Sequence, residues 1–238
     1  AAAEVEQHLQ LVGATGIEDL LQDNVEAVLI ALGEAKVKVW MLTGDKRETA
    51  INIGYSCGLI PPEAEVIRIA DDLGNLEEIL EHMKQKHTGV IGRDEEGKVH
   101  QPVCCVVTGV AVTRLVHEGS ALIPIFIDVC NRCYSLIGCR LSPSNKTRLV
   151  SIMKREDDPM QRSITMAIGD GANDVGMIQE SDIGVGISGK EGRQAVNASD
   201  VAIETFELLL PLVFRYGRSN YTRQSTVFAY SMHKNIVM

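Results

Sequence analysis

The sequence predicts an α/β fold in which a parallel β-sheet has helices on both faces. Short runs of apolar and β-branched residues alternate with segments of helical spacing along most of the 238 residues. This order is typical of parallel strands joined by crossover helices. Several apolar runs end in loops that carry glycine, hydroxyl or carboxylate groups. Ligands of such sheets bind at the carboxyl ends of the strands, so we expect function in these loops.

The first expected elements are a short strand over residues 11–14 and a helix. Apolar side chains recur at helical spacing between residues 25 and 32, and Asn24 precedes them as a candidate cap. A buried strand is expected over 37–42. Further strands are expected at 136–139, 163–168 and 183–187, and each is followed by a helix. A last short strand is expected at 201–203.

The middle of the chain is expected to differ. Residues 61–120 are interpreted as a variable surface excursion. Within it, 71–86 has the pattern of an acidic amphipathic helix and 94–97 that of a hairpin tip. A return strand over 103–107 would then rejoin the sheet.

The most informative segment is Ala167-Ile-Gly-Asp-Gly-Ala-Asn-Asp174, which has the order strand, tight loop, helix. Gly169 and Gly171 allow the backbone a sharp turn. Asp170 and Asp174 are four residues apart, so the two carboxylates can converge on one point. One or two carboxylates, completed by phosphate and water, form the usual shell of Mg²⁺. Taken alone, an acidic glycine-rich loop is as often a simple turn.

A second loop follows the strand over 37–42. Thr43, Gly44 and Asp45 stand between this strand and a helix that begins near residue 48. A hydroxyl and free backbone N–H groups at a helix start can bind an anion. The same residues are also typical of a helix-capping turn.

The third segment is Cys139-Arg-Leu-Ser-Pro-Ser-Asn-Lys146, in which Lys146 falls in the first turn of a helix. The helix dipole disfavours a cation there, so this lysine indicates an anionic partner. The alternative is an ordinary solvated lysine. Together the three loops supply a hydroxyl, a lysine and paired carboxylates, a combination that suits phosphate and Mg²⁺.

These segments resemble the motifs of the haloacid-dehalogenase superfamily, in the form found in the phosphorylation domain of P-type ATPases. The resemblance implies a Rossmann-like sheet of that type. From about Val5 to the end, except near 61–120, the chain resembles the lipid-flippase branch, the P4-ATPases. Three stretches carry this likeness: Gly13-Ala-Thr-Gly-Ile-Glu-Asp-Leu-Leu-Gln-Asp23, Leu42-Thr-Gly-Asp-Lys-Arg-Glu-Thr-Ala-Ile-Asn-Ile-Gly-Tyr55 and Ile183-Gly-Val-Gly-Ile-Ser-Gly-Lys-Glu-Gly192.

The resemblance implies phosphoryl transfer from ATP to an aspartate, followed by hydrolysis. It assigns Asp170 as a ligand of Mg²⁺, with Asp174 binding the ion directly or through its other ligands. Lys146 would neutralise charge on the phosphoryl group.

The remaining motif residues are implied to hold the substrate. Thr43 and the N–H groups of Gly44 and Asp45 would bind phosphoryl oxygens. Arg140 would contact the nucleotide, and Asn173 would donate hydrogen bonds to phosphate or nucleotide.

Two departures and one absence qualify the resemblance. Ser142-Pro-Ser-Asn-Lys stands where Ser-Pro-Leu-Gln-Lys is usual, and Gly176 stands where a bulkier residue is usual. The family's phosphorylated aspartate lies in Asp-Lys-Thr-Gly-Thr, and this string is absent from these residues. We therefore expect the distal part of a phosphorylation domain, inactive by itself.

Four parts are expected along the chain. Residues 1–60 and 121–205 would form the domain core with the motifs, and 61–120 the excursion. Residues 206–238 would form a stalk and the beginning of a membrane helix. Arginines ahead of the last run suit the cytosolic side of a span, but that run is shorter than the roughly 20 apolar residues a span needs.

The implied whole protein is an integral membrane protein of the plasma membrane or of Golgi or endosomal membranes, with this segment in the cytosol. Its implied substrates are ATP and a phospholipid, its cofactor is Mg²⁺, and its partner is a small membrane accessory subunit. A net charge of −9 and only 4% aromatic residues argue against nucleic-acid binding.

The six cysteines are expected to be buried, reduced thiols. Cys130 and Cys133 have zinc-like spacing, but no second pair with matching spacing follows.

Two other functions stay open at this stage. A soluble phosphatase of the same superfamily would need its own aspartate nucleophile, and the nearby candidates, Asp19 and Asp23, lie outside any Asp-x-Asp pattern. Asp19 is also a weaker candidate for a supporting role at the site. A non-catalytic interaction module with the same fold is the other possibility.

Overall fold

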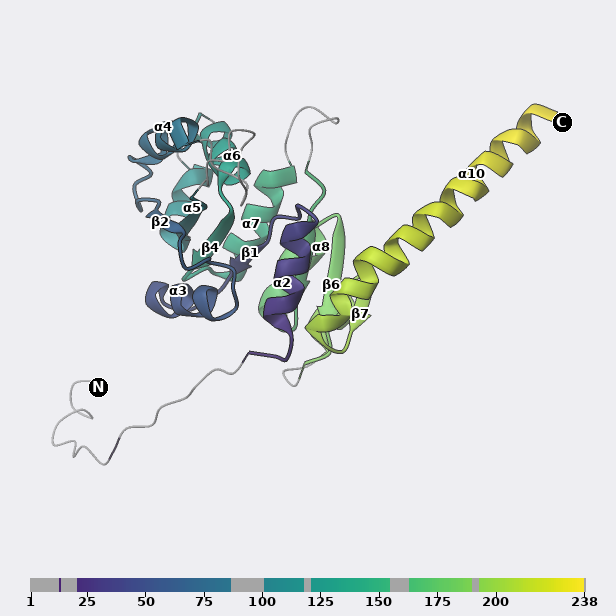
Figure 1. The fold of residues 1–238 in the computed structure, drawn as a ribbon, viewed down its shortest axis with the longest axis horizontal. Helices are drawn as coiled ribbons and strands as arrows, with labels where there is room; N and C mark the ends of the chain where they lie inside the picture. The colour runs from purple at the N-terminus through teal and green to yellow at the C-terminus, as the bar shows by residue number, and fades with distance from the viewer. Residues whose placement is uncertain are drawn as a thin grey trace.

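The computed structural model describes Gly13 and residues 21–86, 101–117, 121–154, 163–189 and 193–237. Within these ranges parallel strands alternate with helices, and helices lie on both sides of the sheets, as the sequence predicts (Figure 1). Three expectations lie outside the described residues: the strand at 11–14 apart from Gly13, the hairpin tip at 94–97, and any role of Asp19.

The larger sheet has four parallel strands in the order β1-β4-β3-β2. The strands β3 and β4 are central and almost completely buried, which is why they consist of apolar runs rather than alternating residues. The expected strand over 37–42 is shorter and only half-buried, because it lies at the edge of the sheet. The four strands are β1 (Trp40–Leu42), β2 (Glu65–Arg68), β3 (Val103–Thr108) and β4 (Ser135–Cys139).

The smaller sheet has three parallel strands in the order β5-β6-β7. Helices α8 and α9 pack on it, where Ala167, Met177, Ile178 and Ala195 form a buried cluster. Leu42 from the end of β1 packs against this cluster, so the two sheets share part of their core. The elements are β5 (Met166–Gly169), η1 (Ala172–Asp174), α8 (Val175–Glu180), β6 (Ile183–Ile187), α9 (Gln194–Ala198) and β7 (Val201–Ile203).

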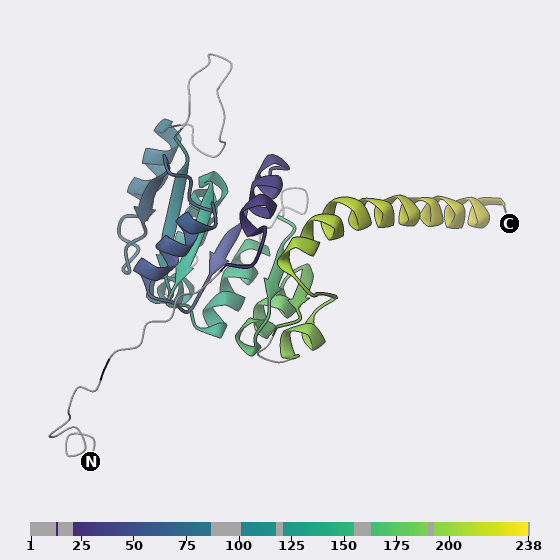
Figure 2. The ribbon, with the colours of Figure 1, turned by 60° about the horizontal axis from the view of Figure 1, so that its bottom comes forward.

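The other helices cover the larger sheet and its boundary with the smaller one (Figures 1 and 2). Helix α2 joins the two sheets, because its buried Val28 and Leu32 pack against Val39 before β1 and Ile168 in β5. These helices are α2 (Val25–Glu34), α3 (Arg47–Ser56), α4 (Leu76–Lys86), α5 (Gly109–His117), α6 (Leu122–Arg132) and α7 (Pro143–Lys154).

Asn24 stands at the expected start of α2, but its side chain does not cap the helix. Its backbone is left-handed, with φ 62°, and no side-chain cap hydrogen bond forms. Instead Nδ2 donates to Oε2 of Glu207 at 3.2 Å. The side chain is therefore used to tie α2 to the residues that precede the C-terminal helix, a contact that local sequence patterns do not encode.

The expectation of a surface excursion over 61–120 is wrong for the described part of that segment. The return strand expected over 103–107 is present as β3, but β2 also belongs to the larger sheet, and α4 and α5 contribute to its core. Leu76, Met83 and Leu115 are each 1% exposed or less. Helix α4 begins at Leu76 rather than near residue 71, because the preceding residues form turns. The apolar face that the amphipathic pattern indicated packs into the core of the larger sheet.

The C-terminal residues form one long projecting helix (Figure 2). The π-helical turns of η3 (Pro211–Gly217) run directly into α10 (Arg218–Val237). Among the described residues, no helix is long and apolar enough to cross a membrane.

All six cysteines are buried free thiols, as expected. The Cys133 thiol donates to the carbonyl of Cys130 at 3.2 Å, and the described residues contain no group of three or more side chains suited to hold a metal. Nζ of Lys38 donates to carbonyls at the end of α6, including that of Cys133 at 3.1 Å. Cys130 and Cys133 thus lie at the C-terminal end of α6, where the ammonium group of Lys38 donates hydrogen bonds to backbone carbonyls.

The buried thiols should make the fold sensitive to alkali. Desolvation raises the pKa of Cys104 from 9.0 to about 11, and burial raises that of Cys130 as well. Because the folded pKa is the higher one, the unfolded chain loses these protons first as pH rises. The free energy of unfolding should therefore fall above about pH 9, by roughly 1.4 kcal/mol per pH unit for each such thiol. Urea unfolding at several pH values measures this slope.

A Cys104→Ala variant is the control for that experiment. Its unfolding free energy should depend less steeply on pH between 9 and 11. In this range the Cys104 thiol ionises in the unfolded chain but stays protonated in the folded one, because burial raises its pKa to about 11. Equal slopes for the two proteins would contradict a buried, neutral Cys104 thiol.

Candidate active site

Backbone hydrogen bonds join the second and third motif loops at the carboxyl ends of β1 and β4. The N–H of Leu141 donates to the carbonyl of Thr43 at 3.0 Å, and the N–H of Arg140 donates to the carbonyl of Asp45 at 2.8 Å. Pairing between the two strands therefore continues into the loops that follow them. This continuation fixes the Thr-Gly-Asp turn against the start of α7.

Within its own turn, Thr43 is bonded to Asp45. Its hydroxyl donates to Oδ2 of Asp45 at 2.6 Å and accepts from the N–H of Asp45 at 3.1 Å. Gly44 and Asp45 are exposed. The turn thus presents the groups expected to bind phosphoryl oxygens, but an anion would have to replace the bonds between Thr43 and Asp45.

Lys146 and Asp174 form the central contact of the site. Nζ of Lys146 lies 2.8 Å from Oδ1 of Asp174, and the two side chains are only 11% and 12% exposed. Lys146 lies in the first turn of α7 and Asp174 ends η1. The anionic partner that the position of this lysine indicated is thus present in the chain itself. A buried ion pair here joins the segment that carries Lys146 to the loop of Asp170 and Asp174.

Asp170 and Asn173 lie in the same loop as Asp174 but are exposed. Asp170 makes no hydrogen bond or ion pair with the part of the chain that the structure describes. An exposed carboxylate in the same loop as one that is held by lysine fits a magnesium ion whose shell is completed by phosphate and water. Convergence of Asp170 and Asp174 on one ion remains a prediction.

The backbone of Arg140 is hydrogen-bonded to Asp45, whereas its side chain is exposed. Its φ of 51° is in the left-handed region. Its carbonyl oxygen comes so near to α5 that a Cβ on Gly109 would lie 2.3 Å from it. The guanidinium is exposed while the backbone is held in place, and its contact with a nucleotide stays a prediction.

Asn145 is a residue of this site that the sequence interpretation passed over. It is 7% exposed, and Nδ2 donates to the carbonyl of Gly109 at 3.0 Å. Its Oδ1 accepts from the Thr113 hydroxyl at 3.2 Å. Asn145 thus holds the start of α7 on α5, one residue before Lys146. The sequence signal for this residue was the replacement of the usual glutamine by Asn145. Glutamine has one more methylene group than asparagine and would need more room in this buried position.

Gly176, the other departure, lies where α7 and α8 approach closely. A Cβ at this position would come 2.5 Å from Oγ1 of Thr147. Thr147 therefore fills the space that a bulkier residue 176 would take. The two departures concern packing around α7 and leave every motif side chain in place.

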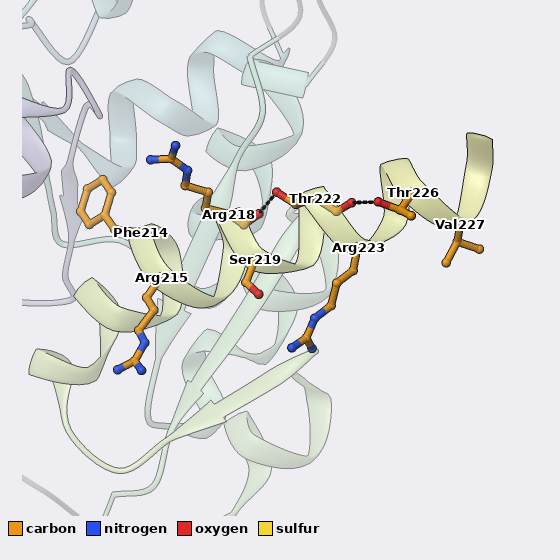
Figure 3. A pocket seen from close by; sticks show the side chains of 8 residues that line it. All are labelled: Phe214, Arg215, Arg218, Ser219, Thr222, Arg223, Thr226 and Val227. Carbon is orange, nitrogen blue, oxygen red and sulfur yellow. Dashed lines mark hydrogen bonds between the residues drawn. The ribbon is translucent and has the colours of Figure 1, made fainter. Parts of the chain in front are cut away.

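An open hollow lies elsewhere, along η3 and α10, and shares no residue with the motif loops (Figure 3). It is lined by Phe214, Arg215, Arg218, Ser219, Thr222, Arg223, Thr226 and Val227.

Comparison with known proteins agrees with the family that the motifs resemble. Residues 196–238 match the family described as "Phospholipid-translocating P-type ATPase C-terminal". Over 98% of its length the chain is 41% identical to a phospholipid-transporting ATPase of Schizosaccharomyces pombe, of which it covers 18%. It is 43% identical over 99% of its length to the probable phospholipid-transporting ATPase DNF3 of Saccharomyces cerevisiae, of which it covers 14%.

The chain belongs to the family of phospholipid-transporting P-type ATPases. A probable phospholipid-transporting ATPase of Arabidopsis thaliana, 38% identical over 98% of the chain, is a further relative. This confirms the family and the class of enzyme predicted from the motifs. The chain spans 14 to 20% of the length of these three relatives. The roles of single residues, the domain boundaries and the activity of a whole transporter therefore stay proposals.

A Gly169→Ala change should disturb this site from within. The added Cβ would lie 2.3 Å from Cβ of Asp174 and 2.7 Å from its Oδ2, so the residue that holds Lys146 must move. Overpacking of this kind typically costs about 1–3 kcal/mol. The measurement is the free energy of unfolding in urea.

Gly44→Ala is the matched control. Its new Cβ would have only the carbonyl oxygen of Leu141 nearby, at an ordinary 3.7 Å, so its stability should change by much less. If the two variants are equally stable, Asp174 is not packed against Gly169.

Proposed function

We propose that this chain is the part of an ATP-driven phospholipid transporter that binds the phosphoryl group and Mg²⁺ during formation and hydrolysis of an aspartyl phosphate. The observation that carries the proposal is the physical joining of the three motif loops. The Thr43 turn is bonded to the Arg140 loop, and the Lys146–Asp174 pair connects the next helix to the acidic loop. These contacts support a site in which a cation, a hydroxyl and carboxylates would act together where charge develops in phosphoryl transfer.

The chain's own residues have distinct tasks in this proposal. Asp174 would hold the Lys146 side chain in position through their 2.8 Å contact, so that the ammonium can stabilise negative charge on a phosphoryl oxygen. Asp170 and Asp174 would hold Mg²⁺, which neutralises phosphate charge when it is bound. The Thr43 hydroxyl would leave Asp45 for a phosphoryl oxygen, with the N–H groups of Gly44 and Asp45 beside it.

The nucleotide would be held from the rim of the site. The exposed guanidinium of Arg140 can bind phosphate through two parallel N–H groups. Asn173 is exposed on the opposite loop and would donate to phosphate or nucleotide.

The phosphorylated aspartate would come from another part of the longer protein, since Asp-Lys-Thr-Gly-Thr does not occur in these residues. Among the described strands, β1 and β5 each pair on one side only. Both lead into motif loops, and they share core contacts through Leu42. A strand that pairs with either edge would bring a strand-end carboxylate to the same side of the fold as Thr43 and Asp170.

A soluble phosphatase is a less suitable function. Its remaining nucleophile candidate in the described residues, Asp23, is exposed in the turn before α2 rather than at a strand end. The three relatives named above are phospholipid-transporting ATPases, and this supports the transporter.

The remaining features of the whole transporter follow from the same proposal. It would be an integral membrane protein of the plasma membrane or of Golgi or endosomal membranes. It would use ATP and a phospholipid as substrates and pair with a small membrane subunit. Residues 206–238 would be its stalk and the beginning of a membrane helix, with the rest of this segment in the cytosol.

Mg²⁺ should stabilise the isolated chain slightly. Binding to the folded state alone raises the midpoint of thermal unfolding by mass action, and the effect should be small because phosphate normally completes the shell. Asp170→Ala should abolish the shift. Asp23→Ala, which removes an exposed carboxylate outside the site, should leave the shift in place.

The same measurement with Zn²⁺ tests the cysteines. A larger shift with zinc that disappears in Cys130→Ser would contradict the interpretation of that pair as structural thiols. A magnesium shift that survives in Asp170→Ala would remove this residue from the proposed metal site.

Lys146→Ala should reduce phosphoenzyme formation by the longer protein about a hundredfold or more, because loss of one preorganised donor typically costs about 2.7–4 kcal/mol. Thr43→Ala should cost less, since the N–H groups beside it remain. The chain alone should form no phosphoenzyme, because its nucleophile is missing. The measurement is the level of acid-stable phosphoprotein after brief incubation with labelled ATP.

Unfolding must be separated from the loss of chemistry in this experiment. Removal of one member of the buried ion pair leaves the other charge without its partner. Each variant is therefore first compared with the unchanged protein by thermal unfolding. Lys146→Arg keeps the charge and should retain the fold and more activity than Lys146→Ala. Near-normal phosphoenzyme in a folded Lys146→Ala protein would remove Lys146 from the site.

A further inference from the structure

Buried polar side chains are concentrated at the start of α7. Five polar or charged residues are buried among those that the structure describes, and three of them are Asn145, Lys146 and Asp174. Polar groups are typically buried only where hydrogen bonds offset the loss of water. The contact between Lys146 and Asp174 accounts for two of the three. The burial of Asn145 has a separate cause.

Both ends of the Asn145 amide bond to α5. Nδ2 donates to the carbonyl of Gly109 at 3.0 Å, and Oδ1 accepts from the hydroxyl of Thr113 at 3.2 Å. The start of α7 is capped without this side chain, because the Ser142 hydroxyl accepts from the N–H of Asn145 at 3.2 Å. The amide is thus directed to a neighbouring helix, and it fixes where α7 begins.

Asn145 and Lys146 hold the first turn of α7 on two sides. Successive residues of a helix are turned by about 100°, so the two side chains leave α7 in different directions. Asn145 contacts α5, whereas Lys146 contacts Asp174 at the end of η1. A lysine has a flexible four-carbon stem, so the position of its ammonium group depends on where its backbone is held. The amide bonds of Asn145 hold that backbone one residue before the lysine.

The residue that Asn145 contacts also supports the Arg140 loop. Gly109 begins α5, directly after β3. A Cβ at this position would lie 2.3 Å from the carbonyl oxygen of Arg140 and 3.0 Å from Nδ2 of Asn145. The absence of a side chain therefore allows both segments to approach the same peptide. The start of α5 is a common support for the loop of Arg140 and the helix of Lys146.

We propose that Asn145 is a positioning residue that fixes the Lys146–Asp174 pair through the start of α5. It touches no substrate and acts on the reaction only through Lys146. The consequence for phosphoryl transfer rests on the proposed function, whereas the effect on the pair itself does not.

The strength of the pair tests the proposal without any activity. Urea unfolding of Lys146→Met, Asp174→Asn and the double variant gives the coupling free energy of the two side chains. The same cycle is then measured with Asn145→Leu present. Leucine fills a similar volume and leaves the Gly109 carbonyl with a donor, the Thr113 hydroxyl at 2.8 Å. The coupling free energy should fall to less than about half, because residues in one network are coupled.

Thr113→Val is a milder second variant, for use if Asn145→Leu fails to fold. It removes the bond to Oδ1 of Asn145 and keeps the bond between Nδ2 and Gly109. The coupling free energy of the pair should then fall by a smaller amount.

Thr147→Val is the matched control. The Thr147 hydroxyl also donates to a carbonyl, that of Pro143 at 3.1 Å, but this bond lies within α7. The variant removes one hydroxyl from the same helix without loosening the helix from α5. The coupling free energy of Lys146 and Asp174 should therefore stay unchanged.

Phosphoenzyme formation by the longer protein tests the consequence for the reaction. Displacement of a reacting group by about 1 Å can cost roughly a hundredfold in rate, and we expect a loss of about tenfold in Asn145→Leu at saturating ATP. Asn145→Leu should cause no further loss in a Lys146→Ala protein, because its effect passes through the lysine. The ATP concentration at half-maximal rate should change less than about twofold, since the Arg140 loop keeps its own contact with Gly109.

Two results would overturn the proposal. Unchanged coupling free energies in the Asn145→Leu and Thr113→Val backgrounds would show that the pair does not depend on the bonds to α5. Equal rate losses from Asn145→Leu with and without Lys146 would show that Asn145 supports the fold alone. If Lys146→Ala leaves phosphoenzyme formation normal, the proposed function fails, and the coupling free energy still decides whether Asn145 positions the pair.

Discussion

The buried contact between Lys146 and Asp174 is the constraint on which the rest of the site depends. It joins α7, which follows the larger sheet, to η1, which follows β5 of the smaller sheet. Removal of one partner from such a pair typically costs about 3–5 kcal/mol, because the other charge stays buried without compensation. The close approach around it leaves no room for a Cβ at Gly169 or at Gly176. A change in the packing of this region would therefore also move the Lys146 ammonium group.

Fixed backbone and exchangeable side chains are combined in the motif loops. Hydrogen bonds between main-chain groups hold the Thr43 turn to the Arg140 loop, and a ligand need not disturb them. The side-chain bond between Thr43 and Asp45 is exposed and can be replaced by a bond to phosphate. Such an arrangement lowers the cost of organising donors when charge develops, because the backbone is already in position.

The motif loops and the C-terminal helix differ in how the fold treats charge. In the motif loops a cation and an anion are paired and nearly buried, which gives each a defined direction. Along α10 Arg218 and Arg223 are exposed, and no acidic residue occurs from residue 208 to residue 238. The paired arrangement suits chemistry at one point.

The sequence by itself determined the fold class, the three motif loops and the strands that carry them. Those features are local, since an apolar run, a glycine turn and a helix start occupy adjacent residues. It also led to the family, which the comparisons confirmed. Tertiary structure decided the rest. It showed that Asn24 bonds to Glu207 rather than capping α2, that β2, α4 and α5 belong to the larger sheet and its core, and that the anion beside Lys146 is Asp174. Each of these depends on contacts between residues far apart in the chain, and spacing within one segment does not encode such contacts.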